Sequence, residues 1–472
     1  MDHMKNLTLT NIAQACAGKL YHGEKASDRE VSGVVLDSRQ VEENFLFIAT
    51  PGERVDGHAF IKEVLKKGAA GVVCEKEPEG TEEPYILVKD SFLALKDIAE
   101  YYRKQLKTKV IGITGSVGKT STKELIASVL SVKYKVLKTE GNFNNEVGLP
   151  LTVLKIRENH EAAVLEMGIS DFGEMHRLSR IARPDICVLT NIGQCHLENL
   201  KSREGILKAK TEIFDFMQED GFVCVNGDDD MLVTIEEVYG KTPVHFGCGE
   251  SNRVYADEIE DKGLFGSRAR IHMDDVSFYA DIPLLGGHMV YNALAAACVG
   301  GLLGLTAEEI KEGIAQVKPV GGRSHIMRLT DKVLLDDCYN ANPVSMRAAL
   351  DLLATAHTRK VAVLGDMFEL GENTEELHRK TGIYAAEKKI DVIVCIGRLS
   401  RYMYQGALET AVQTEMQPAS VFWFETKAEF LERMTGIINR DDTILVKASH
   451  GMGFEELVKE LEKQKKWEEN WL

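Results

Sequence analysis

A short segment of the chain carries the residue types of a phosphate-binding loop. It lies between the apolar run KVIGIT and the helical pattern STKELIASVL, and it contains Gly115, Ser116, Val117, Gly118, Lys119, Thr120 and Ser121. In such a context glycines let the backbone wrap phosphates, a lysine reaches the terminal phosphates, and a threonine hydroxyl binds Mg²⁺. The spacing departs from the strict pattern, because Ile113 stands where its first glycine would be. A glycine turn before an ordinary helix is the alternative, but the strand and helix context favours a nucleotide site.

Other residues suited to this chemistry lie after apolar runs. Glu166 ends AAVLE, where a parallel strand would deliver an acid to the phosphate edge of a sheet, and Asp336-Asp337 could bind ribose hydroxyls or a metal. His196 follows DICVLTNIGQ, and its position alone leaves a metal ligand, a phosphate contact and a structural role open. Lys210 lies in a helical pattern, where periodicity alone favours a solvated surface lysine.

The elements that position these residues predict an α/β protein of three domains. Short β-rich runs and an amphipathic helix fill the first hundred residues, as in a small α/β unit. The phosphate-binding segment then opens an ATPase unit that we expect to be doubly wound, with antiparallel strands near its end. After KPVGGRS the alternation begins again, which predicts a Rossmann-like unit. The expected domains are 1–105, 106–319 and 320–472.

Composition limits the partners and the compartment. Lys and Arg number 57 against 73 Asp and Glu, a net charge of −16, so we expect no nucleic acid partner. The nine cysteines are scattered without a C-x-x-C pair, which favours a reducing compartment. No signal-peptide pattern opens the chain, and its longest apolar stretch, 293–305, is shorter than the roughly 18 to 20 residues of a membrane span. We expect a cytoplasmic protein that binds no membrane, and a monomer.

Several motifs occur together in one order along the whole chain. They are GSVGKTS, NFNNEVGLP, LEMG, TNIGQCHLE, AKTEIF, HMVYNALAA, GGRS, DDCYNANP and GDMFELGENTEELH. This set resembles the Mur ligase family, the ATP-dependent amide-bond ligases of peptidoglycan precursor synthesis. The resemblance implies three hinged domains that close over ATP and Mg²⁺. The first domain would bind a UDP-linked substrate, and the last would contribute to ligation.

The resemblance also implies roles for single residues. The loop with Lys119 would hold the ATP phosphates, Thr120 and Glu166 would bind one Mg²⁺, and His196 would bind a second. Lys210 matches a lysine that the family carbamylates, an anionic group near the metal, which opposes the surface interpretation. Lys119, Lys210 and His196 are thus the expected catalytic residues.

Further residues match the family's nucleotide and substrate contacts. Asn292 resembles an adenine-reading asparagine, Arg323 a phosphate-contacting arginine of the domain hinge, and Asp337 a ribose-binding acid. The segments expected to bind the uridine nucleotide contain Asp37, Ser38, Arg39, Asp56 and His58, although ordinary turns would be favoured without the resemblance. Candidates for dipeptide contacts are Asn144, Asn145 and the loops around Asp366, Glu369 and Ser449.

Two positions depart from the family pattern. Met289 stands where asparagine is common, beside the expected adenine contact, and His450 stands where arginine is common. The departures fall beside the expected adenine contact and in the expected C-terminal substrate pocket.

The implied reaction forms an amide bond through an acyl phosphate. The YNANP and GENTEELH segments most resemble members that join D-alanyl-D-alanine to UDP-N-acetylmuramoyl-tripeptide, with a UDP-muramoyl-pentapeptide as product. The alternatives are a sister ligase that adds one amino acid, a folylpolyglutamate synthase, and a nucleotide-gated ATPase switch. Neither the third residue of the tripeptide nor the strictness of dipeptide selection is predicted.

Overall fold

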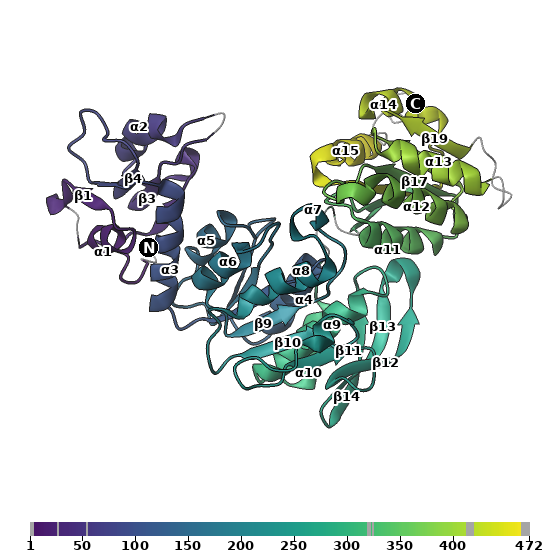
Figure 1. The fold of residues 1–472 in the computed structure, drawn as a ribbon, viewed down its shortest axis with the longest axis horizontal. Coiled ribbons are helices and arrows are strands. Elements are labelled where there is room, and N and C mark those ends of the chain that lie inside the picture. Colours follow the sequence, from purple (N-terminus) through teal and green to yellow (C-terminus); the bar gives the residue numbers. More distant parts are fainter. Residues whose placement is uncertain are drawn as a thin grey trace.

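The chain folds around three separate sheets that follow one another in sequence. The computed structural model describes residues 4–25, 28–52, 55–318, 322, 325–411 and 420–463, except for the side chain of Leu264. A nine-stranded sheet lies between a five-stranded and a six-stranded one (Figure 1). This arrangement confirms the expected α/β architecture in three domains, whereas the boundaries at 105 and 319 stay predictions.

The five-stranded sheet of the N-terminal domain has the order β1-β5-β4-β3-β2, and only β1 runs antiparallel to its neighbour. Its elements are α1 (Leu9–Ala15), β1 (Lys19–Tyr21), β2 (Gly33–Val35), β3 (Phe45–Ile48), α2 (Ile61–Lys66), β4 (Gly71–Cys74), β5 (Tyr85–Leu87) and α3 (Ser91–Gln105). Helix α3 begins where the Asp90 side chain accepts a hydrogen bond from Leu93 N–H, and it buries Leu95, Ile98 and Tyr102 at helical spacing. It packs against α1 of its own domain and against α5 and α6 of the central domain.

The nine-stranded sheet of the central domain has the order β14-β13-β12-β11-β10-β9-β6-β8-β7. Its strands are β6 (Lys109–Thr114), β7 (Val136–Lys138), β8 (Ala162–Glu166), β9 (Ile186–Leu189), β10 (Phe222–Asn226), β11 (Val244–Gly247), β12 (Val254–Asp261), β13 (Ser267–Met273) and β14 (Val276–Ile282). Its helices are α4 (Lys119–Ser131), α5 (Gly148–Val153), α6 (Glu174–Ala182), α7 (Leu197–Leu200), α8 (Arg203–Thr211), α9 (Met289–Leu302) and α10 (Ala307–Ala315). Strands β6 to β12 are parallel, whereas β13 and β14 are antiparallel as expected. Because β6 lies between β8 and β9, the loops that follow these three strands meet at one edge of the sheet.

The six-stranded sheet of the C-terminal domain has the order β15-β16-β20-β17-β18-β19. Its elements are β15 (His325–Arg328), β16 (Val333–Asp336), α11 (Pro343–Ala354), β17 (Lys360–Gly365), α12 (Thr374–Glu387), β18 (Val392–Ile396), α13 (Ser400–Ala411), β19 (Val421–Phe424), α14 (Lys427–Arg433), β20 (Thr443–Lys447) and α15 (Glu455–Lys463). All pairings are parallel except that of β15 with β16. The sheet therefore also presents the carboxyl ends of its parallel strands at one edge.

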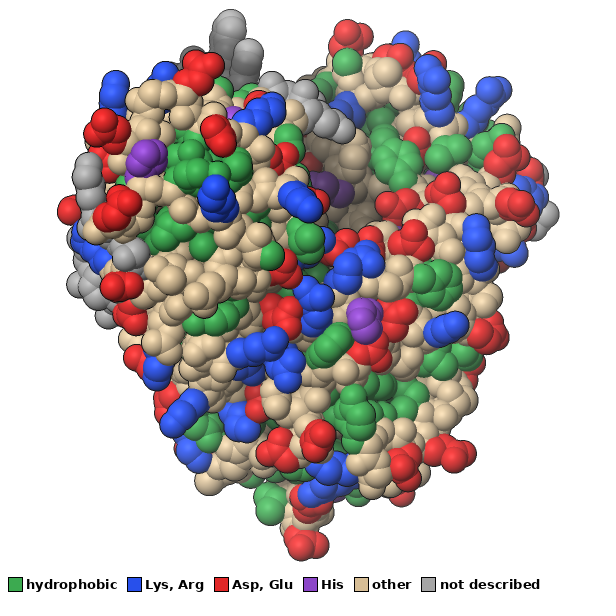
Figure 2. All heavy atoms as spheres, turned by 60° about the vertical axis from the view of Figure 1, so that its left-hand side comes forward, with side chains coloured by type: hydrophobic (Ala, Val, Ile, Leu, Met, Phe, Trp, Pro, Cys, Tyr) green, Lys and Arg blue, Asp and Glu red, His purple; other side chains and the backbone are tan. Residues whose placement is uncertain are grey.

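The surface of the molecule is hollowed between two lobes, and acidic and basic side chains are mixed over the face that Figure 2 shows. Among the helices of the described residues, none is both long and apolar enough to cross a membrane.

Candidate active site

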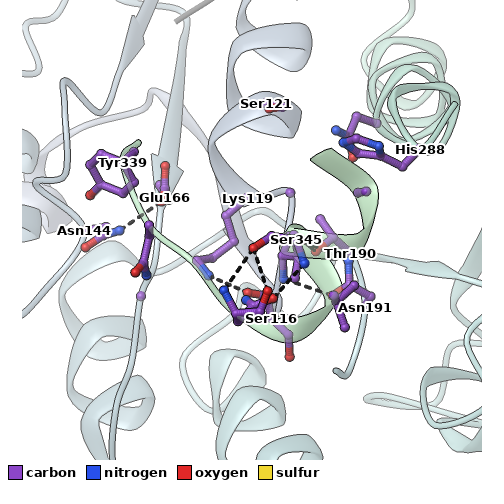
Figure 3. Close-up of a pocket in the computed structure, with 18 of the residues that line it drawn as sticks. Ser116, Lys119, Ser121, Asn144, Glu166, Thr190, Asn191, His288, Tyr339 and Ser345 are labelled. Atoms are coloured by element: carbon purple, nitrogen blue, oxygen red, sulfur yellow. Dashed lines mark hydrogen bonds between the residues drawn. The ribbon is translucent and has the colours of Figure 1, made fainter. Parts of the chain in front are cut away.

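A cleft of about 680 Å³ lies between the central and C-terminal domains (Figure 3). The predicted residues that line it are Ser116, Val117, Gly118, Lys119, Ser121, Asn144, Asn145, Glu166, His196, Asn292 and Asp337. They come from the loops after β6, β7, β9 and β16, from the end of β8, and from helices α4 and α9. Residues that are far apart in the sequence thus meet around one cavity.

The phosphate loop is held in shape by its glycines and by the loop after β9. Gly118 has a φ of 84°, and at Gly115 a Cβ would lie 1.9 Å from Thr190 Oγ1, so neither position accommodates a side chain. Val117 N–H donates to Asn191 Oδ1 at 3.0 Å, and Asn191 Nδ2 donates back to Val117 O at 2.9 Å. The loop is therefore braced at the N-terminus of α4, where the helix dipole favours an anion.

Lys119 places its ammonium group over this loop. Its Nζ donates to Gly115 O at 2.7 Å, and the side chain lines the cleft. A phosphate that entered the loop would therefore meet a positive charge beside it.

Glu166 and Thr120 form a buried pair at the end of β8. Each is 1% exposed, and Thr120 Oγ1 donates to Glu166 Oε2 at 2.7 Å. The other carboxylate oxygen accepts from Asn144 Nδ2 at 2.9 Å, and the Lys123 ammonium lies 3.9 Å from Oε2. A hydroxyl and a carboxylate, both oxygen donors, are the protein ligands that Mg²⁺ prefers.

The residues present fit Mg²⁺ held partly by phosphates and water. Within the described ranges, no three His, Cys, Asp or Glu side chains gather in the way that would hold a metal by themselves. Mg²⁺ commonly takes one or two protein ligands and completes its shell with substrate phosphates and water. The Thr120–Glu166 pair beside the phosphate loop suits that mode of binding.

His196 lies directly before α7 and lines the same cleft. Its Nδ1 lies 2.6 Å from Glu369 Oε2 of the C-terminal domain, and the side chain is 25% exposed. Burial lowers the pKa of His196, Glu369 opposes that shift, and the Lys119 and Lys210 ammonium groups act with burial. The imidazole is thereby favoured in its neutral form, the form that binds metals.

Lys210 lies on α8 behind this surface, and its side chain is 1% exposed. The interpretation as a solvated surface lysine is therefore wrong. Burial lowers the pKa of Lys210 to about 8, the nearby Cys195 opposes the shift, and Lys119 contributes to it. A substantial fraction of neutral amine close to physiological pH makes this lysine chemically reactive.

The nucleoside end of the cleft is built from α9 and the loop after β16. Asn292 Oδ1 accepts from Thr122 Oγ1 at 3.1 Å, while its Nδ2 donates to Met289 Sδ at 3.2 Å. Asp337 accepts from Lys447 Nζ at 2.6 Å. The Met289 departure thus touches Asn292 directly, whereas Arg323 lies outside the described residues.

The loops at the C-terminal side differ in what their polar groups do. Asp366 Oδ1 accepts from Ser400 N–H at 2.7 Å and from Ser400 Oγ at 2.6 Å, which ties this acid to the start of α13. Ser449 is buried, and its Oγ accepts from Phe368 N–H at 2.9 Å. His450 is exposed, with its ring 5.4 Å from that of Tyr339 in the cleft lining. Asp366 and Ser449 therefore shape the loops.

The predicted uridine-binding residues lie on turns of the N-terminal domain and do not line the cleft between the other two domains. Asp37 accepts from Arg39 N–H and pairs with its guanidinium at 2.7 Å, just before Ser38. Asp56 accepts from His58 N–H at 3.0 Å and lies 2.6 Å from its Nδ1.

Sequence reasoning missed several residues that line the cleft. Thr190, Asn191, His288, Tyr339 and Ser345 all lie around it (Figure 3). Thr190 and Asn191 follow the apolar run DICVL directly, Tyr339 comes after the two acids that follow VLL, and His288 and Ser345 lie at the starts of helices. Four of them lie in the motifs TNIGQCHLE, HMVYNALAA and DDCYNANP, but their residue types alone suggested no role.

Comparisons with known proteins agree over the whole chain. Three family models match in order: the Mur ligase family catalytic domain at residues 30–103, the Mur ligase middle domain at 113–300, and the Mur ligase glutamate ligase domain at 322–450. The UDP-N-acetylmuramoyl-tripeptide--D-alanyl-D-alanine ligase of Bacillus subtilis (strain 168) is 39% identical, with 96% of this chain and 98% of that protein covered.

Solved structures give the same result. A MurF structure from Acinetobacter baumannii has a TM-score of 0.86 and 33% identity, covering 97% of this chain and 98% of that one. MurF ligase from Thermotoga maritima, solved in complex with ADP, has a TM-score of 0.79 and 29% identity, covering 92% and 97% of the two chains.

Proposed function

This chain belongs to the Mur ligase family, and from that premise we propose that it joins D-alanyl-D-alanine to UDP-N-acetylmuramoyl-tripeptide with conversion of ATP to ADP and phosphate. The observation that carries the proposal is the 39% identity over almost the full length of a curated relative named for that reaction. The product would be the UDP-muramoyl-pentapeptide used in peptidoglycan synthesis.

The chemistry explains why a nucleotide cleft serves an amide-bond ligase. A carboxylate is a poor electrophile at neutral pH, so one of its oxygens first attacks the γ-phosphorus of ATP and ADP leaves. The amine of D-alanyl-D-alanine then attacks the acyl carbon, loses a proton, and expels phosphate. Holding the two reactants together can contribute about 7 to 11 kcal/mol when they are well aligned.

The phosphate transfer brings anions together, and the residues at the loop are suited to it. We propose that Lys119 and the loop N–H groups hold the ATP phosphates and stabilise the charge that develops on them. Thr120 and Glu166 would hold one Mg²⁺ and His196 a second. Mg²⁺, when bound, supplies neutralising charge at the phosphates.

We propose that Lys210 carries a carbamate. Its neutral amine would attack CO₂ and lose a proton, which forms an N–C bond and gives an anion. A pKa of about 8 supports this modification, because about a tenth of the amine is then already neutral at pH 7. The carbamate would be a buried anion near the cation that His196 would hold, and it would replace a buried ammonium group.

The remaining cleft residues would read the nucleoside. We propose that Asn292 contacts adenine, Asp337 the ribose hydroxyls, and Arg323 the phosphates. Asp337 is already aligned by Lys447, and Asn292 by Thr122. These contacts would set which nucleotide is accepted.

We propose that the N-terminal domain binds the uridine nucleotide through the turns that carry Asp37, Ser38, Arg39, Asp56 and His58. The Arg39 side chain is 87% exposed and is therefore accessible to an anionic ligand. Asn144 and Asn145, in the cleft lining, would contact the peptide substrates.

We also propose that the protein acts as a monomer in the cytoplasm, where ATP is available. Its nine cysteines are unpaired thiols, which suits a reducing compartment.

The proposal is tested by phosphate release with Mg-ATP, UDP-N-acetylmuramoyl-tripeptide and D-alanyl-D-alanine, omitting each component in turn and weighing the product. Lysine and diaminopimelate forms of the tripeptide are tried in parallel. We expect release only with all three components, together with a pentapeptide product. Phosphate release in the absence of D-alanyl-D-alanine would instead indicate an ATPase switch, and a product formed with a single amino acid would indicate a sister ligase.

A further inference from the structure

The central and C-terminal domains meet at His196 and Glu369. The histidine follows β9 of the central domain, and the glutamate follows β17 of the C-terminal domain. Their Nδ1 and Oε2 atoms are 2.6 Å apart. The glutamate is 59% exposed, so the contact does not result from general burial in a core.

Both backbones are constrained to make this contact. His196 has a φ of 50° and Glu369 a φ of 62°, in the left-handed region that residues with a Cβ rarely adopt. Such conformations persist only where the surroundings determine them. The loop that carries Glu369 is anchored by the hydrogen bond from Phe368 N–H to Ser449 Oγ at 2.9 Å. Gly371 of the same loop also has a positive φ, 68°, and it approaches the central domain closely, because a Cβ there would lie 3.8 Å from Glu198 N.

Glu369 contacts Nδ1 of the His196 ring, which leaves the other ring nitrogen, Nε2, to bind a metal. His196 Nδ1 is buried and forms no hydrogen bond with favourable angles to any described group, Glu369 included, so its contact with Glu369 Oε2 is a close ion-pair distance of 2.6 Å. A carboxylate at Nδ1 favours the tautomer that carries the proton there, which leaves the lone pair of Nε2 for a cation. Metal-binding histidines commonly have such a carboxylate on the second ring nitrogen, and it fixes the ring orientation and raises the ligand's basicity.

We propose that Glu369 is a positioning residue for His196, supplied by the C-terminal domain, so that cation binding and the docking of this domain strengthen each other. The inference rests on the role of His196 as a cation ligand in the proposed function. When the C-terminal domain moves away, His196 loses the group that orients it. By thermodynamic linkage, the factor by which docking raises the affinity for the cation equals the factor by which the bound cation raises the equilibrium constant for docking.

The test measures binding of Mn²⁺, used as a paramagnetic substitute for Mg²⁺, to the full-length protein with ADP by electron paramagnetic resonance. We compare Glu369→Ala and Glu369→Gln with Glu372→Gln, an exposed glutamate of the same loop. We expect Glu369→Ala to weaken binding about tenfold. Glu369→Gln keeps an acceptor oxygen and should weaken binding less, and Glu372→Gln should bind as the wild type does.

A second measurement separates positioning from a general structural effect. In a His196→Ala background, Glu369→Ala should cause no further loss of Mn²⁺ affinity, because the group that it positions is absent. Small-angle scattering should also show that Mg-ADP compacts the Glu369→Ala and His196→Ala variants less than it compacts the wild type. Melting temperatures of the variants check that each is folded.

The proposal is overturned if Glu369→Ala binds Mn²⁺ as Glu372→Gln does, or if its effect is undiminished without His196. None of these measurements uses the peptide substrates. A failure of the ligase assay would therefore leave the result standing, whereas normal ligation with unchanged Mn²⁺ binding would overturn only this inference.

Discussion

The phosphate loop of the central domain and the turns of the N-terminal domain use their polar residues differently. At the loop, Lys119 and the Thr120–Glu166 pair stand at or directly behind the cleft surface. In the N-terminal domain, Asp37 and Asp56 accept hydrogen bonds from backbone N–H groups of their own turns. The first set borders the cleft in which a ligand would bind, while the second set stabilises its own turns.

The difference separates two kinds of binding residue. Replacing a side chain that borders the cleft is expected to change catalysis, with little effect on stability. A group that caps its own turn is expected to change stability first, and binding only through the shape of the turn. Substitutions at the two regions should therefore give opposite patterns.

The largest effect is expected at Lys119. Replacing it with alanine removes the charge that stabilises the transferring phosphate, and we expect kcat to fall about 10³-fold. The melting temperature should stay the same, because the side chain lines an open cleft and packs into no core. The exposed Lys208→Ala serves as the matched control. If Lys119→Ala instead lowered the melting temperature well below that of Lys208→Ala, Lys119 would act structurally.

The next effect concerns the stability of the chain around Lys210. Its pKa is about 8 in the folded chain against 10.5 in the unfolded chain, so the folded chain releases its proton first and the free energy of unfolding rises between pH 8 and 10.5. Below pH 8 both states are protonated, and the buried charge costs up to about 3 kcal/mol. Lys210→Met should therefore be more stable at pH 7 in CO₂-free buffer, by urea unfolding, and should not show that rise. Equal curves for the two proteins would contradict the burial of a charged amine.

A smaller effect is expected at Asp56. Asp56→Ala removes the side chain that accepts the His58 N–H bond and should lower the melting temperature. It should also raise KM for the UDP-linked substrate while kcat is unchanged. Asp56→Asn can still accept the His58 N–H bond and should restore stability. If it restores KM as well, the residue acts through the turn, and if it does not, the carboxylate itself meets the substrate.

The smallest effect is expected at Met289, where the chain departs from its family. A thioether sulfur is a weak acceptor for the Asn292 amide, and an asparagine oxygen at this position would hold that amide more firmly. We expect Met289→Asn to lower KM for ATP about two- to fivefold with kcat unchanged. An increase in KM would show that Asn292 needs the freedom that Met289 gives it.

Much of this architecture could be predicted because its signals are local. Buried strands such as β6, β8 and β17 are continuous apolar runs, and the glycine loop between a strand and a helix defines the phosphate site. The short strands β7 and β15 have only partly buried, polar-interrupted sequences, so no pattern distinguishes them from loops. They form because a neighbouring strand is available for pairing.

The parts that could not be predicted depend on contacts between distant residues. Lysine is a residue type that is rarely buried, yet Lys210 lies at helical spacing from Ile206 on the face of α8 that packs into the domain. Likewise, Asp366 looks free for a substrate in the sequence, yet it is bound to Ser400. The contact of Glu369 with His196 joins two domains, and no local pattern specifies it.

The central claim is that the cleft activates a carboxylate as an acyl phosphate for amide-bond formation. It is tested most directly by labelling the terminal carboxylate of the UDP-N-acetylmuramoyl-tripeptide with ¹⁸O and following the label through one complete reaction with Mg-ATP and D-alanyl-D-alanine. Because a carboxylate oxygen leaves with the phosphate, each phosphate released should carry one ¹⁸O atom. Unlabelled phosphate, released together with the pentapeptide or without it, would contradict the account.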